Sequence, residues 1–266
     1  MKLKLMNNND LLVEATGKRL VRMAYPSQYA VGNYYQLTFD EYPQYVWVQL
    51  DASIKPTLIY VKDEWNYQIP FNIQREWPYP DGAFLGKNHY SWAKLATKEE
   101  IRIYQNLAIN TYDQHVSTNA FPHVTANAET RNEMSFFAKN AIDGIAANNK
   151  HGGYPFQSWG INQRDDAEFK LDFGREVEVD QLNILLRADY PHDISWKEMT
   201  IQFSDGSYEK INLHRDKNYQ IFSISKRTIT WLKLVDLIKD EDSESFPALT
   251  QIEVMGSNIQ EGQKNE

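Results

Sequence analysis

A short run of polar and aromatic residues closes a strand-like segment in the second half of the chain. The stretch "LRADYPHDISW" (186–196) begins as a strand and then gathers six such side chains within ten positions. Sugars are bound by aromatic rings that stack on their apolar faces and by fixed donors and acceptors that meet their hydroxyl groups. The run therefore predicts a ligand-binding rim, with the candidate residues Arg187, Asp189, Tyr190, His192, Asp193 and Trp196.

A second polar stretch, "NNKHGGYPFQSWGINQR" (148–164), has the same character and adds His151 and Asn162 to the candidate ligand-binding residues. The planar fork of Arg187 can donate to two oxygens of a ligand. Several of these residues can instead have a purely structural role. Arg187 and Asp189 can form an ion pair, adjacent His and Asp residues can bond to each other within a loop, and Trp196 can be a plug in the core.

Motifs of known catalytic sites are missing from the sequence. There is no G-x-S-x-G elbow, no phosphate-binding loop and no H-E-x-x-H pair. Glycosidases use two carboxylates across a cleft, and no pair stands out among 36 acidic residues. The sequence therefore predicts no catalytic residues and a protein that is not an enzyme, with a site between two domains as the less favoured alternative.

The charge balance narrows the classes of partner. The 266 residues carry a formal net charge of −8, which disfavours nucleic acid and anionic membranes as main partners. There is no cysteine, so disulfides and thiolate metal sites are excluded. The first twelve residues lack a signal-peptide pattern and no run is long and apolar enough to span a membrane, so a cytoplasmic location is expected.

The first part of the chain has the pattern of a small β-rich domain. Short runs rich in β-formers alternate with Pro, Gly, Asn and Asp clusters over residues 1–97. Thr97 and Glu100 then form a Thr-x-x-Glu capping box, which marks the start of a helix. We therefore expect an N-terminal sandwich-like domain over 1–97 and a linker helix over 98–110.

A second β-rich region follows the linker. Thr130 and Glu133 form another capping-box pattern that predicts a second short helix. Strand patterns resume near residue 166, and an Asp205-Gly206 pair between alternating runs predicts a hairpin. The expected organisation is an all-β protein with a β-sandwich over 111–257, short connecting helices and a disordered tail over 258–266.

The second region resembles the discoidin, or coagulation-factor type C, family. Five pieces occur in the family's order, "AKNAIDGIAANN", "QSWG", "AEFKLDFGREVEVDQLNILLR", "MTIQFSDGS" and "LTQIEVMG", within residues 110–257. The resemblance implies a galactose-binding-like jelly-roll sandwich, in which loops at one end recognise the ligand. Many bacterial members are carbohydrate-binding modules. The N-terminal domain resembles no family that we can name.

The same resemblance implies a structural calcium ion, although no cofactor is required for binding. Asp143 matches the family's first carboxylate ligand, and the family's C-terminal acidic ligand falls at Gln251, with Glu253 two residues on. Calcium prefers six to eight oxygen ligands. The usual ligands after "DG" are replaced here by "IAANN". The structural alternative is that Asp143 caps a turn before Gly144.

Three functions remain open from the sequence. The favoured one is a non-catalytic carbohydrate-binding protein that uses loops at one end of the C-terminal sandwich. The second is an intracellular scaffold that binds a protein partner, which the missing signal-peptide pattern favours. The third is a carbohydrate-active enzyme with a site between the domains.

Overall fold

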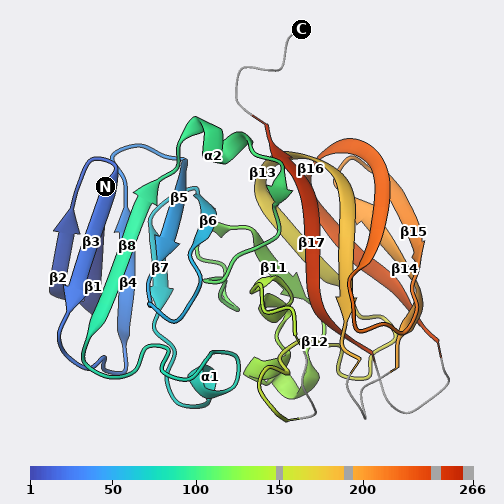
Figure 1. The fold of residues 1–266 in the computed structure, drawn as a ribbon, viewed down its shortest axis with the longest axis horizontal. Helices are drawn as coiled ribbons and strands as arrows, with labels where there is room; N and C mark the ends of the chain where they lie inside the picture. Colours follow the sequence, from blue (N-terminus) through green and yellow to red (C-terminus); the bar gives the residue numbers. More distant parts are fainter. Residues whose placement is uncertain (148–151, 189–193, 241–246, 260–266) are drawn as a thin grey trace, which may run out of the picture.

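The computed structural model describes residues 1–147, 152–188, 194–240 and 247–259. It is built almost entirely from antiparallel strands, with only short helices, so the all-β prediction is confirmed. Figure 1 shows two β-rich halves side by side, with the middle of the chain between them. No helix among the described residues is long and apolar enough to cross a membrane.

The N-terminal half consists of two sheets that face each other across one core. Their strand orders are β2-β1-β4-β7 and β10-β6-β5-β8-β3. Alternate residues of β4 are buried, and so are Val46 and Val48 of β5, because successive side chains of a strand point to opposite faces. The elements are β1 (Lys2–Asn7), β2 (Asp10–Thr16), β3 (Leu20–Tyr25), β4 (Asn33–Thr38), β5 (Gln44–Gln49), β6 (Thr57–Val61), β7 (Trp65–Gln68), α1 (Ile73–Glu76) and β8 (His89–Leu95).

Short elements lie between β8 and β13 in the chain. They are α2 (Lys98–Arg102), β9 (Gln105–Asn106), β10 (Ala120–Phe121), β11 (His123–Ala126), β12 (Trp159–Gly160) and three 3-10 helices, η1 (Thr130–Asn132), η2 (Met134–Phe136) and η3 (Ala138–Ile142). The C-terminal strands are β13 (Phe169–Leu186), β14 (Trp196–Phe203), β15 (Tyr208–Asn212), β16 (Gln220–Lys239) and β17 (Ala248–Asn258).

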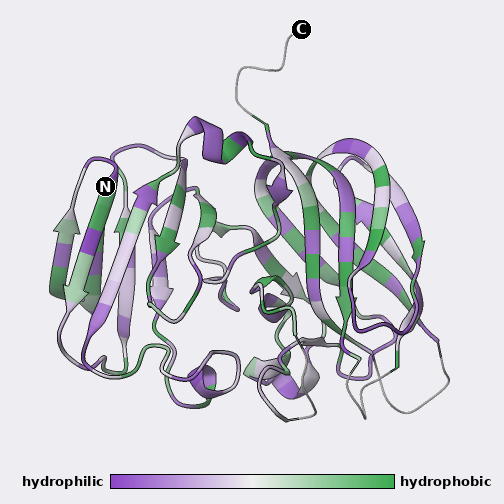
Figure 2. Ribbon diagram, viewed as in Figure 1, coloured by the Kyte–Doolittle hydropathy of each residue, from purple (hydrophilic) through white to green (hydrophobic). Residues whose placement is uncertain are grey.

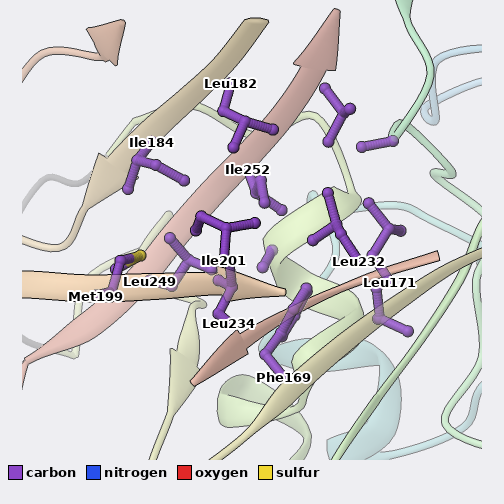
Figure 3. Packing of buried hydrophobic residues seen from close by; sticks show 14 of the residues in the cluster. Phe169, Leu171, Leu182, Ile184, Met199, Ile201, Leu232, Leu234, Leu249 and Ile252 are labelled. Atoms are coloured by element: carbon purple, nitrogen blue, oxygen red, sulfur yellow. The ribbon is translucent and has the colours of Figure 1, made fainter. Parts of the chain in front are cut away.

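The C-terminal half is a sandwich in which two long strands belong to both layers. The first part of β13 pairs with β11 and with the second part of β16, which in turn pairs with β14. The second part of β13 pairs with β17 and with the first part of β16. Hydrophobic and polar residues alternate along these strands in Figure 2. Figure 3 shows the core between the layers, where Phe169 and Leu171 of β13 lie near Leu232 and Leu234 of β16.

A bulge carries β13 from one layer to the other. The pairing with β16 shifts between Asp172 and Val177, and Gly174 in this interval has a φ of +68°. A Cβ atom at Gly174 would lie 2.3 Å from the ring of Phe121. The position therefore needs glycine both for its left-handed backbone and for the close approach of an aromatic ring.

The segment between the halves is not the linker helix expected over 98–110. The Thr97 and Glu100 capping box forms as predicted, with Glu100 N donating to Thr97 Oγ1 at 3.2 Å and Thr97 N donating to Glu100 Oε2 at 2.8 Å. The helix, however, ends at Arg102. Residues 105–126, which we call the crossover segment, then pass repeatedly between the two cores, because apolar side chains within it are buried on opposite sides.

The crossover segment contributes strands and core residues to both halves. β9 pairs with β17 and β11 pairs with β13, whereas β10 between them pairs with β6 of the N-terminal half. Leu107 and Ala108 belong to the C-terminal core, but Tyr112 belongs to the N-terminal core. The Tyr112 hydroxyl accepts a hydrogen bond from Leu50 N at 2.9 Å. The segment therefore ties the halves together over its whole length.

The prediction of a second capping box at Thr130 and Glu133 is wrong. Glu129, not Thr130, is the residue before η1, and it makes no side-chain cap bond. Thr130 Oγ1 accepts a hydrogen bond from Asn162 N at 3.0 Å, and Glu133 pairs with Arg131. Both side chains thus have other partners, and the region folds as three short 3-10 helices. The Asp205-Gly206 hairpin is confirmed between β14 and β15.

Replacing Gly174 tests the bulge. We expect Gly174→Ala to lower the free energy of unfolding more than Gly206→Ala. Gly206 also has a positive φ, but a Cβ there meets nothing within 4 Å. Backbone strain alone costs about 1–2 kcal/mol, and overpacking against Phe121 adds about 1–3 kcal/mol. Urea unfolding of both variants measures the difference; equal losses would show that the close approach of Phe121 does not constrain the fold.

Candidate functional site

A cavity of about 350 Å³ lies where the two halves and the crossover segment meet. We call it the junction pocket. Its polar and aromatic lining comes from all three parts, with Tyr79 from the N-terminal half, Thr111 and Asp113 from the crossover segment, and Lys139, Asp143 and Tyr154 from the C-terminal half. The volume lies near the lower limit of ligand sites, which span about 300–1,000 Å³. The pocket therefore suits a small polar ligand.

Lys139 is a buried cation in the wall of the pocket. It lies on η3, all five residues of which are buried, and its Nζ lies 5.1 Å from the centre of the Tyr79 ring. It also donates to Asn140 Oδ1 at 3.4 Å. A cation over an aromatic face is attracted by the ring quadrupole. The ammonium group is thus held in place and retains further donor hydrogens.

Asp113 is anchored to β11, which belongs to the C-terminal sheet. Its Oδ1 lies 2.8 Å from His123 Nδ1 and its Oδ2 accepts a hydrogen bond from Val124 N at 3.1 Å. Burial raises the pKa of Asp113 although His123 and the charge of Lys139 act against this rise. Burial lowers the pKa of His123, but the hydrogen bond and charge of Asp113, aided by Asp172, outweigh it and leave that pKa raised.

Asp143 lies at the end of η3 and is bonded on one side. Its Oδ1 accepts hydrogen bonds from Ile145 N at 2.8 Å and from Gln251 Nε2 at 2.7 Å. Its Oδ2 is inaccessible to solvent and has no hydrogen-bond partner among the described residues. Burial raises the pKa of Asp143 to about 7, against these hydrogen bonds and the charge of Lys139. The carboxyl group supports the loop that follows it.

Tyr154 supplies an aromatic ring that a ligand can reach. Its exposed fraction is 44%, whereas Tyr79 is buried and its hydroxyl lies 3.2 Å from that of Tyr67. Burial, followed by the charges of Asp143 and Asp81, raises the pKa of Tyr154, so the phenol remains a neutral donor. Thr111, which also lines the pocket, is fixed by donating to Lys55 O at 2.9 Å. The pocket thus combines one accessible ring with positioned polar groups.

The rim predicted at residues 186–196 is in part a core feature. Trp196 is fully buried at 0% exposure, with its ring centre 6.3 Å from that of Trp159, so the expectation that it offers a stacking surface is wrong. Arg187 is 1% exposed and its guanidinium lies 5.7 Å from the centre of the Phe156 ring. These side chains pack against the sandwich. The remaining candidates in the rim lie outside the described residues: Asp189, Tyr190, His192 and Asp193.

The candidates of the second stretch do not join the junction pocket. Asn162 has a φ of +50° and its Oδ1 accepts a hydrogen bond from Arg131 N at 3.2 Å, which fixes the loop beside η1. It does not line the pocket. His151 lies outside the described residues. Tyr154, from the same stretch, is the residue that reaches the pocket.

The three residues implied as calcium ligands do not converge. Gln251 contacts Asp143 as described, but Glu253 Oε2 accepts a hydrogen bond from Asn183 Nδ2 at 2.7 Å. Burial raises the pKa of Tyr219, and the charge of Glu253 and a hydrogen bond to Glu253 raise it further. Within the described parts of the chain, no group of three or more acidic or histidine side chains is arranged to hold a metal ion.

Sequence reasoning missed Lys139, Thr111 and Asp113. Lys139 carried a usable signal, because it is the single charge in the mainly apolar run "SFFAKNAI", and a charge in such a place predicts a paired side chain. Thr111 and Asp113 carried none, because their positions depend on the path of the crossover segment. That path follows from tertiary packing and leaves no periodic pattern.

A larger and more open groove of about 770 Å³ runs between the halves elsewhere. Amide side chains dominate its polar lining, so we call it the amide groove. Two of its apolar residues, Ile73 and Val116, are 66% and 72% exposed. Its amides are Asn66, Gln68, Gln74, Gln114, Asn119 and Asn132.

The chain was compared with known families, curated proteins and solved structures. No family model and no curated protein matches the chain. Similar solved structures include a chitosan-binding module from a chitosanase/glucanase of Paenibacillus sp. IK-5, with 17% identity over 58% of this chain and 100% of that chain, at a TM-score of 0.41. A fucose-binding module of Streptococcus pneumoniae has 15% identity over 56% and 96% of the two chains, also at 0.41.

A third similar structure is the family 32 carbohydrate-binding module of C. perfringens NanJ in complex with galactose. It has 14% identity over 50% of this chain and 91% of that chain, at a TM-score of 0.38. The β-sandwich itself follows from the strand topology described above.

The Asp113–His123 pair predicts a pH dependence of stability. Both pKa values are raised in the folded state, so the folded chain binds protons more tightly than the unfolded chain. The contribution of His123 to the free energy of unfolding is complete below its unfolded pKa of about 6.5 and is lost as the pH rises through its raised folded-state pKa. The raised pKa of Asp113 likewise makes stability fall as the pH rises. His123→Asn keeps a donor near the Nδ1 position but cannot be protonated.

We expect wild-type stability to fall as the pH rises above about 6.5, and to fall less in His123→Asn. Urea unfolding at several pH values measures both slopes. Identical slopes for the two proteins would contradict the role given to this pair.

Proposed function

We propose that this protein binds a carbohydrate without transforming it, and that the junction pocket is the binding site. The observation that carries the proposal is the pairing of the accessible Tyr154 ring with fixed polar groups in a cavity of small-ligand size. The ring would stack on the C–H face of a sugar. Lys139 would donate a hydrogen bond to one sugar hydroxyl group, and Thr111 Oγ1 would accept a hydrogen bond from another. The discoidin-type resemblance of residues 110–257 implies the same class of ligand.

The state of the pocket carboxylates favours binding over hydrolysis. Glycoside hydrolysis needs two carboxyl groups that reach opposite sides of a glycosidic bond. Both oxygens of Asp113 are engaged with His123 and Val124. Asp143 Oδ1 is engaged with Ile145 and Gln251, and Oδ2 is inaccessible to solvent. Neither group is presented to a ligand, which supports a binding function.

Substitution of Tyr154 tests the site. We expect Tyr154→Ala to weaken sugar binding by about tenfold, because loss of a stacking ring costs about 1–1.5 kcal/mol. Calorimetric titration with a panel of neutral and amino mono- and oligosaccharides at millimolar concentrations measures the affinity. Tyr208→Ala is the matched control, since Tyr208 is 67% exposed on β15 and does not line the pocket.

Two results would count against the proposal. One is wild-type protein that binds no member of the panel. The other is equal affinity of wild type and the Tyr154→Ala variant for the sugar that does bind, which would place the site elsewhere. Hydrolysis of an oligosaccharide from the panel by wild type would instead revive the enzymatic alternative.

A protein partner at the amide groove is the second candidate function. The exposure of Ile73 and Val116 in one concave surface favours it, because exposed apolar side chains gathered in one groove often mark an interaction site. We expect a partner bound there to be lost in Val116→Asp and retained in Tyr154→Ala. A pull-down with the two variants tells the two surfaces apart. Loss of the partner in Tyr154→Ala alone would show that the partner binds at the junction pocket and not at the amide groove.

A further inference from the structure

The side chain of Gln251 is buried and makes three hydrogen bonds to the chain around η3. Its Oε1 accepts from Gly144 N at 3.0 Å. Its Nε2 donates to Asn140 O at 2.6 Å and to Asp143 Oδ1 at 2.7 Å. One partner is a donor and two are acceptors, so only one orientation of the amide satisfies all three contacts. The position of the NH₂ group is therefore determined by its surroundings.

The two oxygens that receive the Gln251 hydrogens are of the kind that a calcium ion would bind. Calcium takes carboxylate and backbone carbonyl oxygens at about 2.3–2.6 Å. Asn140 O and Asp143 Oδ1 both face the NH₂ group of Gln251. A cation between them would meet the positive end of the amide dipole, and the charge of Lys139 acts on the same carboxylate. The residues present therefore do not fit the calcium ion that the family resemblance implies.

We propose that the Gln251 amide takes the place of that calcium ion and fixes the loop after η3 without a metal. The loop contributes Gly144, Ile145 and Ala146 to the junction pocket. Gln251 lies on β17, and its amide contacts both Gly144 N in the loop and Asn140 O in η3. The amide therefore ties the loop to β17. The shape of this wall of the pocket is thus independent of calcium. This proposal does not depend on the pocket's ligand.

The test is the response of thermal unfolding to calcium at pH 8. Wild type is expected to have the same Tm in 5 mM CaCl₂ and in 5 mM EDTA. Gln251→Glu replaces the NH₂ group with a carboxylate oxygen that joins Asn140 O and Asp143 Oδ1. We expect it to be less stable than wild type in EDTA and to gain about 5 °C in Tm on addition of calcium.

Asp143→Asn is the second variant, because an amide oxygen at this position can still accept from Gln251 and Ile145. We expect it to be less stable than wild type, because its NH₂ group takes the buried Oδ2 position, and we expect its Tm to ignore calcium. A wild-type Tm that rises with calcium and falls with EDTA would overturn the proposal. So would the absence of any calcium response in Gln251→Glu, or a rise of Tm with calcium in Asp143→Asn.

Discussion

The structure depends on one constraint, which is that adjacent residues of the crossover segment are anchored in opposite halves. The hydroxyl of Tyr112 bonds to Leu50 N in the N-terminal core, and the carboxylate of Asp113 bonds to His123 in the C-terminal sheet. The halves cannot move apart without exposing a buried aromatic ring or breaking a buried polar pair, and each is costly. The angle between the two sandwiches is therefore fixed by their shared chain.

The contacts around this anchor extend the same junction. Arg175, next to the β13 bulge, lies 5.2 Å and 5.3 Å from the ring centres of Tyr45 and Tyr60 of the N-terminal half. Its Nε donates to Asn258 Oδ1 at 2.7 Å. Trp77 of the N-terminal half packs edge-on against Phe156. A pocket assembled from both halves and the crossover segment can keep its geometry only because these contacts hold them in one arrangement.

Local patterns in the sequence predicted local structure well. The short β-forming runs between turn clusters predicted a strand-rich N-terminal half, and the Thr97–Glu100 pair predicted a helix start with its capping box in place. The Thr130–Glu133 pair has the same spacing, yet no box forms, because Thr130 and Glu133 bond to Asn162 and Arg131 instead. A capping pattern competes with every other partner that tertiary structure brings near, and the sequence does not show those partners.

The site was harder to predict for the same reason. Trp196 and Arg187 have side chains that suit a sugar, but their place at the end of the sandwich core buries them. Lys139, Thr111 and Asp113 become neighbours only after the crossover segment has passed between the halves. The match of Gln251 to a cation ligand was visible in the sequence, whereas its role as a donor to Asn140 and Asp143 required the geometry.

The central claim is that a sugar binds in a pocket built jointly by the two halves. Amide chemical shifts of ¹⁵N-labelled protein, followed while the sugar is titrated, test it most directly. The largest changes are expected on Tyr79, Thr111, Gly144 and Tyr154, which come from the N-terminal half, the crossover segment and the C-terminal half. Changes confined to the end of the C-terminal sandwich around Arg187 and Gln220, with the pocket residues silent, would contradict it.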